Sequence, residues 1–196
     1  MSDSLEIQAL KAKYRKKQSL LRKEFSDNLS QDVFNVIAKK VIKTIKQNNI
    51  EKPVVSGFLP IGSEVDVRPA LDLALENDFE ICLPCVVEKD KPLIFRQWRD
   101  GDELVKEKFG TQAPTKQAEI LIPNIIITPL LAFDKKKYRL GYGGGFYDRT
   151  ISKFNKKNHK YITIGVALDI QRIDEVPIGK YDKALDFVIT EKYIYK

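Results

Sequence analysis

The chain has 196 residues, of which 43% are hydrophobic and 31% charged, and it carries a net charge of +7. This length and apolar content suffice for one well-buried domain and are short for two. No run approaches the roughly 20 apolar residues of a membrane-spanning helix, and the acidic, apolar-poor first residues argue against an import or secretory signal. We therefore expect one domain over residues 1–196, a cytoplasmic location and no membrane association.

Most of the excess positive charge lies in the first 50 residues, which hold eleven Lys or Arg and five Asp or Glu. This favours an anionic partner, either nucleic acid or a small polyanion such as a nucleotide. The basic residues of the first helix spread around its surface without the interleaved aromatic residues of a base-stacking platform. Solvated helix surface explains most of these basic residues, and we expect no nucleic-acid partner. The basic residues of this helix are Lys11, Lys13, Arg15, Lys16, Lys17, Arg22 and Lys23.

The first half of the chain opens with two expected helices and continues with alternating elements. Helices are predicted over 5–25 and 31–48, the second from its apolar stripe, with a polar break at 28–30 in which Ser30 is placed to cap. Strands are predicted over 53–59, 79–83 and 93–97, and a helix over 67–75. The connection from there to Pro114 gives no clear assignment.

The second half continues the alternation. The run 120–133 contains 125–128, whose apolarity on both faces predicts a central strand. A helix beginning at 145 and strands over 161–168 and 186–190 follow. Strands alternating with helices predict an α/β fold, here a single three-layer domain with a largely parallel central sheet flanked by helices. Ligands of such sheets bind beyond the carboxyl ends of the strands.

Two cysteines, Cys82 and Cys85, stand at the end of a predicted strand. A redox pair needs its first cysteine at a helix N-terminus, where the thiolate is stabilised. A zinc site needs more ligands, and the chain has one histidine, His159. We interpret both cysteines as reduced, structural thiols.

The most informative segment is the glycine-rich run 139–149, which holds four of the ten glycines. Glycines are tolerated where positive φ or close approach of a ligand to the backbone is needed, and the predicted helix behind them offers free N–H groups and a positive dipole end to an anion. The run lacks the Lys of a Walker A loop and the third Gly of the dinucleotide fingerprint. A phosphate-bearing ligand is favoured, and a plain surface turn is the alternative.

Several segments together resemble the 5-formyltetrahydrofolate cyclo-ligase family, also called methenyltetrahydrofolate synthetases. The resemblance covers nearly the whole chain in the right order, and the glycine run is its most specific part. It departs at Phe146, where the family often has Tyr, and at Tyr142, where it often has a basic residue. The matching segments are Lys11 to Arg15, 58–60 with 64–66, 132–134, 139–148, and the tail 177–191.

The resemblance implies ATP- and magnesium-dependent cyclisation of 5-formyltetrahydrofolate to 5,10-methenyltetrahydrofolate, with release of ADP and phosphate. ATP would be a co-substrate, Mg²⁺ the metal, small molecules the partners and the monomer the working form. The chemistry asks for phosphate positioning and charge neutralisation more than for a nucleophilic side chain, so no catalytic residue is named. The alternative is a non-catalytic nucleotide- or RNA-binding protein on the same fold.

The resemblance also implies roles for individual residues. As bare signals, the basic pair could be ordinary helix surface and the two aspartates helix-start or turn carboxylates. The implied ATP-binding residues are Lys11, Arg15, Arg139, Leu140, Gly141, Tyr142, Gly143, Gly144, Gly145, Phe146 and Tyr147. The implied folate-binding residues are Leu59 and Glu64, together with Tyr142, Gly143, Gly144, Gly145 and Phe146. The implied magnesium ligands are Asp148 and Asp182.

Overall fold

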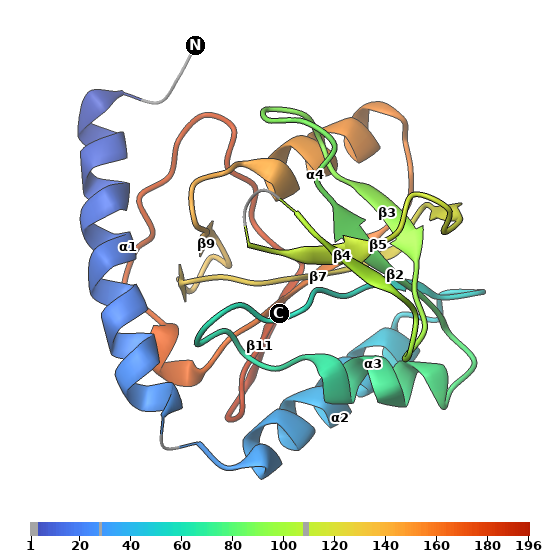
Figure 1. Cartoon of the computed structure of the whole chain (residues 1–196). Helices are drawn as coiled ribbons and strands as arrows, with labels where there is room; N and C mark the ends of the chain where they lie inside the picture. Colours follow the sequence, from blue (N-terminus) through green and yellow to red (C-terminus); the bar gives the residue numbers. More distant parts are fainter. Residues whose placement is uncertain (1–3, 28, 108–109) are drawn as a thin grey trace.

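The computed structural model describes residues 4–27, 29–107 and 110–196. It is built on an eight-stranded sheet with the order β12-β11-β10-β7-β1-β2-β3-β6 (Figure 1). The strands from the first half of the chain are β1 (Val54–Ser56), β2 (Glu80–Cys85), β3 (Ile94–Gln97) and β6 (Ile120–Leu121). Those from the second half are β7 (Ile125–Thr128), β10 (Ile162–Val166), β11 (Phe187–Ile189) and β12 (Ile194–Tyr195).

The centre of this sheet is parallel and its edges are antiparallel. β10 pairs parallel with β7 and β11, and β1 pairs parallel with β7 and β2. β12, β3 and β6 join in antiparallel fashion. The expected α/β fold with a largely parallel sheet is therefore confirmed, whereas the antiparallel edges were not predicted.

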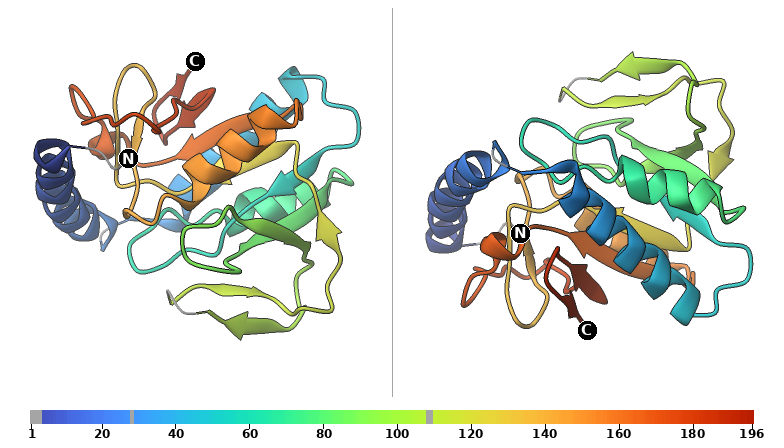
Figure 2. Two further views of the ribbon diagram at one scale, coloured as in Figure 1. Left: turned by 90° about the horizontal axis from the view of Figure 1, so that it is seen from above. Right: turned by 90° about the horizontal axis from the view of Figure 1, so that it is seen from below.

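Helices cover both faces of the sheet, which gives three layers (Figure 2). α2 (Gln31–Gln47) and α3 (Arg68–Leu75) pack on one face, and α4 (Phe146–Lys156) packs on the other. β7 shows the division, because Ile125 and Ile127 join the core under α2 and α3, whereas Ile126 joins Phe154 of α4. All four residues of β7 are buried, as the predicted central strand requires.

α1 (Leu5–Ser26) stands at one side of the sheet instead of covering a face (Figures 1 and 2). Its buried residues are Lys11, Gln18 and Arg22, whereas Leu5 and Leu20 are among its exposed ones. This reverses the usual pattern of a surface helix, whose apolar stripe faces the core. Lys11 and Arg22 are therefore not among the basic residues that solvated helix surface explains.

The remaining elements are short. β4 (Leu104–Lys106) and β5 (Gln112–Pro114) form a hairpin in the segment that had no assignment, and β8 (Ala132–Phe133) pairs with β9 (Arg139–Leu140). This second hairpin lies between the central strand β7 and the rest of the glycine run. A short 3₁₀ turn, η1 (Asp169–Gln171), follows β10.

The expected helices agree with the structure to within one residue at each predicted end, and α4 begins one residue later than predicted. Ser30 stands at the N-cap of α2, but its hydroxyl makes no capping hydrogen bond. The Val33 N–H is instead satisfied by the Ser30 carbonyl at 3.2 Å. Asn28, the first residue of the predicted break, lies outside the described residues.

Candidate active site

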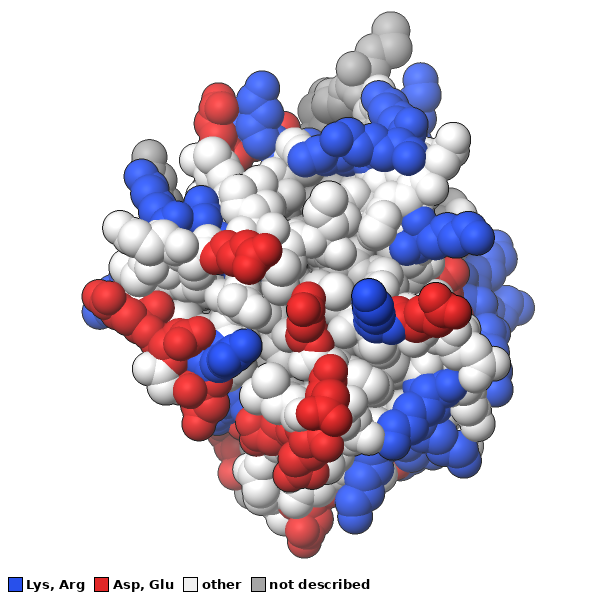
Figure 3. Space-filling model, turned by 90° about the vertical axis from the view of Figure 1, so that its right-hand side faces the viewer, with Lys and Arg blue, Asp and Glu red and all other residues white. Residues whose placement is uncertain are grey.

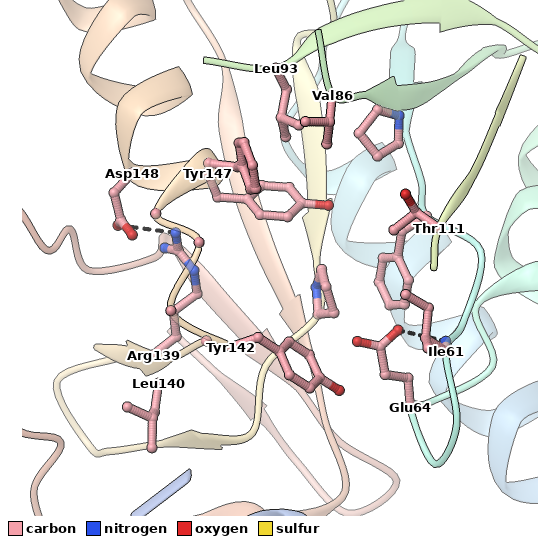
Figure 4. A pocket seen from close by; sticks show the side chains of 18 of the residues that line it. Ile61, Glu64, Val86, Leu93, Thr111, Arg139, Leu140, Tyr142, Tyr147 and Asp148 are labelled. Carbon is pink, nitrogen blue, oxygen red and sulfur yellow. Dashed lines mark hydrogen bonds and ion pairs between the residues drawn. The ribbon is translucent and has the colours of Figure 1, made fainter. Parts of the chain in front are cut away.

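A cavity of about 880 Å³ opens beyond the carboxyl ends of the parallel strands and reaches from α1 to the β4–β5 hairpin (Figure 4). Every site residue named from the sequence lines it, although these residues come from four separate segments. They are Lys11, Arg15, Leu59, Glu64, Arg139, Leu140, Gly141, Tyr142, Gly143, Gly144, Gly145, Phe146, Tyr147, Asp148 and Asp182. The structure thus places the candidate residues together, as the strand-end rule predicts.

The glycine run forms the loop between β9 and α4. Gly143 has φ +102° and Gly145, the N-cap of α4, has φ +66°. Residues other than glycine rarely adopt either backbone conformation. An added Cβ on Gly143 would lie 3.2 Å from Cζ of Arg15, so the loop and the cation of α1 are closely packed. The backbone thereby comes close to the cavity at the N-terminus of a helix.

Three cations among the residues that line the cavity face this loop, and Arg149, which does not line it, donates from Nη2 to the Gly144 carbonyl at 2.6 Å. Arg15 donates from Nε to the Gly141 carbonyl at 2.8 Å, and burial lowers the pKa of Arg15 while Asp182 raises it. Lys11 makes a 2.6 Å ion pair with Asp182. Arg139 is almost fully buried and makes a 3.0 Å ion pair with Asp148. With three cations and two carboxylates, this end of the cavity carries an excess of one positive charge.

The two aspartates meet at this end of the cavity from different elements. Asp148 lies in the first turn of α4, and Asp182 lies in the loop before β11, where its Oδ2 accepts from the Gly179 N–H at 2.8 Å. Burial raises the pKa of Asp148, Arg139 lowers it, and the nearby charge of Asp182 raises it again. The charge of Asp182 therefore acts on the Asp148 carboxyl at this end of the cavity.

Asp148 and Asp182 offer oxygen donors of the kind that Mg²⁺ prefers. The described residues contain no group of three or more His, Cys, Asp or Glu that could enclose a metal ion. Magnesium, however, is typically held by one or two carboxylates together with substrate phosphates and water. Two carboxylates beside a glycine loop at a helix N-terminus fit that requirement, and each is paired with a cation.

Glu64 lies at the opposite wall, on the loop after β1. It is 8% exposed, and its Oε2 accepts from the Ile61 N–H at 2.9 Å. Burial raises the pKa of Glu64, and its hydrogen bonds with Ile61 and Tyr142 and the charge of Arg22 lower it. The side chains of Tyr142 and Glu64 point toward each other in Figure 4.

Reasoning from the sequence missed much of the remaining lining. Apolar groups come from β1, β2 and the connections that follow, and polar groups come from α1 and the β4–β5 hairpin. These additional lining residues are Gln8, Phe58, Ile61, Pro84, Val86, Leu93, Glu107, Thr111, Gln112 and Pro129. The strand-end rule could have found those near β1 and β2, but no signal marked the hairpin.

Three other features of the sequence lie away from the cavity. Trp98 is buried in the core beneath α2 and α3. Cys82 and Cys85 are both free and buried, which confirms the interpretation as structural thiols. Burial raises the pKa of Cys85 to about 11, so this thiol is protonated at neutral pH. Lys135, from the lysine-rich turn, lines a separate hollow with Arg172.

Comparison with known proteins gives the family. The model of the 5-formyltetrahydrofolate cyclo-ligase family matches residues 7–191. The chain belongs to this family. A 5-formyltetrahydrofolate cyclo-ligase of Escherichia coli K12 is 30% identical over 147 residues, which are 72% of this chain and 80% of that protein. One of Mycolicibacterium smegmatis is 35% identical over 150 residues, which are 70% of this chain and 73% of that protein.

Solved structures agree with this assignment to the cyclo-ligase family. The structure of Aquifex aeolicus 5,10-methenyltetrahydrofolate synthetase matches with a TM-score of 0.70 and 29% identity, covering 95% of this chain and 92% of that one. The synthetase of Mycoplasma pneumoniae, at 22% identity and a TM-score of 0.69, shares the fold. The chain is therefore an enzyme of the cyclo-ligase family, and the resemblance noted in the sequence is confirmed.

Proposed function

We propose that this protein catalyses the ATP- and Mg²⁺-dependent cyclisation of 5-formyltetrahydrofolate to 5,10-methenyltetrahydrofolate, with release of ADP and phosphate. The observation that carries the proposal is the two-ended cavity. One end has a glycine loop at a helix N-terminus, three cations and two carboxylates, and the other has apolar walls and the buried Glu64. A single cavity of this kind suits a phosphate donor and a largely apolar acceptor in contact.

The proposed reaction needs an activated formyl group, because the formyl oxygen is a poor leaving group. Transfer of the γ-phosphoryl group of ATP to this oxygen gives an iminium phosphate and ADP. N10 of the folate then attacks the formyl carbon, the C–O bond breaks, phosphate leaves and N10 loses its proton. These steps require positioning and charge neutralisation, and no side-chain nucleophile.

In this proposal the ATP phosphates lie against the loop 141–147 and are neutralised by Lys11, Arg15 and Arg139. The loop supplies backbone N–H groups, which bind phosphate oxygens well at a helix N-terminus. Arg15 is already held against the loop by its bond to the Gly141 carbonyl. Arg139 packs with its guanidinium 5.8 Å from the centre of the Tyr147 ring, which limits its movement.

Asp148 and Asp182 would hold Mg²⁺ in this proposal. A bound Mg²⁺ supplies charge neutralisation at the transferring phosphoryl group. Each carboxylate also orients one cation of the site: Asp182 is paired with Lys11, and Asp148 is paired with Arg139. If the carboxylates bind Mg²⁺ in place of these cations, Lys11 and Arg139 become available to the ATP phosphates.

The folate is proposed to bind between Leu59, Glu64 and the ring of Phe146. A buried carboxylate can accept hydrogen bonds from the N–H groups of a pterin, and charge-assisted bonds of this type are the stronger ones. The neighbouring apolar walls, which include Val86 and Leu93, would pack against the remainder of the ligand. Apolar walls with a few placed polar groups are typical of small-molecule sites.

We also propose that the protein is a single domain that acts as a monomer in the cytoplasm and has no nucleic-acid partner. No helix within the described part of the chain is long and apolar enough to cross a membrane. The face opposite α1 carries separate groups of acidic and basic side chains instead of a continuous basic surface (Figure 3). This distribution on that face favours small-molecule partners over an extended polyanion.

The test is an optical assay for the methenyl product. Purified protein is mixed with 5-formyltetrahydrofolate, ATP and MgCl₂, and parallel reactions omit ATP or add a chelator. We expect product only in the complete reaction, with one ADP formed for each methenyltetrahydrofolate. Product formation without ATP consumption, or binding of both ligands without turnover, would overturn the proposal.

A further inference from the structure

Arg22 is a buried cation of α1 that does not line the cavity, yet it is connected to it. It is 3% exposed. Its Nε donates to Oγ of Ser63 at 3.1 Å, its Nη1 to the Leu130 carbonyl at 3.2 Å and its Nη2 to the hydroxyl of Tyr142. Three bonds from one planar guanidinium fix its orientation as well as its position. Of its three acceptors, the Tyr142 hydroxyl is the one that belongs to a residue lining the cavity.

The contact with Arg22 determines what the Tyr142 hydroxyl can do. A phenolic oxygen that accepts a bond from a guanidinium keeps its own proton for another acceptor. Figure 4 shows the hydroxyl directed toward the Glu64 carboxylate, and burial together with the nearby Glu64 charge raises the pKa of Tyr142. Arg22 therefore fixes the Tyr142 hydroxyl in a position that faces the Glu64 carboxylate.

This arrangement matters because Glu64 has no cation bonded to it among the described contacts. One of its oxygens accepts from the Ile61 N–H, and the Tyr142 hydroxyl faces the carboxylate from the cavity side. A buried carboxylate with only neutral donors is costly to keep charged. Arg22 supplies positive charge at one remove, which offsets part of the cost of burying the Glu64 charge while the carboxylate still faces the cavity.

We propose that Arg22 is a positioning residue for substrate recognition, acting through the Tyr142 hydroxyl to hold the Glu64 carboxylate toward the N–H groups of a pterin. This inference rests on the proposed function and adds a residue to it.

The test is a double-mutant cycle read in Michaelis constants. Arg22→Met and Tyr142→Phe should each raise KM for 5-formyltetrahydrofolate about five- to twentyfold and leave KM for ATP within about twofold. In a Glu64→Gln background, the Arg22→Met change should alter the folate KM by less than about twofold, because the group it positions is gone. Arg22→Lys, which keeps the charge, should recover part of the loss.

Two matched variants separate positioning from packing. Ser63→Ala removes one acceptor of Arg22 but not Tyr142, and Tyr193→Phe removes the hydroxyl of an exposed tyrosine; both should keep the folate KM within about twofold of wild type. If Arg22→Met does not fold, as judged by thermal unfolding, the Tyr142→Phe and Glu64→Gln cycle decides alone. Additive effects in that cycle, or equal losses for folate and ATP, would overturn the inference. Wild-type protein without turnover would instead refute the proposed function.

Discussion

Replacing Gly143 by valine tests the phosphate-binding role of the glycine loop most directly. Gly143 has φ +102°, and a Cβ there would lie 3.2 Å from Cζ and 3.4 Å from both terminal nitrogens of Arg15. Valine therefore brings both backbone strain and a conflict with a cation of the site. We expect the loop to rearrange and Arg15 to move away from the Gly141 carbonyl.

The magnitude follows from two contributions. A residue held in a sparsely populated φ/ψ region costs about 1–3 kcal/mol, and a hydrogen bond from a charged donor contributes about 1.5–3 kcal/mol. Part of this total appears as a lower free energy of unfolding. If about 2–4 kcal/mol is lost from ligand binding, the affinity for ATP falls about 30- to 1,000-fold, since each 1.4 kcal/mol corresponds to a factor of ten.

The assay is isothermal titration calorimetry with a non-hydrolysable ATP analogue and Mg²⁺, alongside thermal unfolding. Gly101→Val is the matched control, because Gly101 has φ +89° with nothing within 4 Å of an added Cβ and does not line the cavity. It should lose stability from strain and keep its nucleotide affinity. Unchanged affinity in Gly143→Val, or an equal loss of affinity in both variants, would refute the phosphate-binding role of the loop.

Two further predictions concern the carboxylates. Asp148→Asn and Asp182→Asn should each raise the Mg²⁺ concentration for half-maximal rate at least about tenfold, since even outer-shell partners of metal sites are worth about 10- to 100-fold in metal affinity or activity. Asp66→Asn, at a carboxylate paired with the exposed Arg68, is the control and should leave that concentration unchanged. Normal turnover of either site variant at limiting Mg²⁺ would contradict the metal assignment. Burial raises the pKa of Glu64 above its ordinary value of 4.5, so its contribution to stability is fully present below pH 4.5 and is lost as the pH rises through the raised pKa. Glu64→Gln should therefore gain in Tm relative to wild type between pH 4.5 and pH 7, and a constant difference across that range would show that the carboxylate is not desolvated.

The sequence by itself predicted the α/β class, the helices and the central strand. These follow from local periodicity: α2 buries one apolar stripe, and β7 is apolar on both faces because helices cover both sides of it. The glycine run also predicted its own backbone geometry, because glycine is the residue type that readily adopts positive φ, as Gly143 and Gly145 do. The β4–β5 hairpin was not predicted, because its strands are only three residues long and therefore too short for a periodic signal in the sequence.

The resemblance named Lys11 and the two aspartates as site residues, but only the tertiary structure decided which partners these charged side chains meet. As local patterns, Lys11 and Arg22 fit ordinary basic helix surface, but α1 turns them inward against Asp182 and Tyr142. Their burial depends on partners more than 100 residues away, and no local pattern carries that information. The same holds for the meeting of Asp148 with Asp182, which the crossover order of the parallel strands brings to one edge of the sheet. A sequence specifies local conformation through neighbouring residues, whereas a site is specified by contacts that form only after the sheet has assembled.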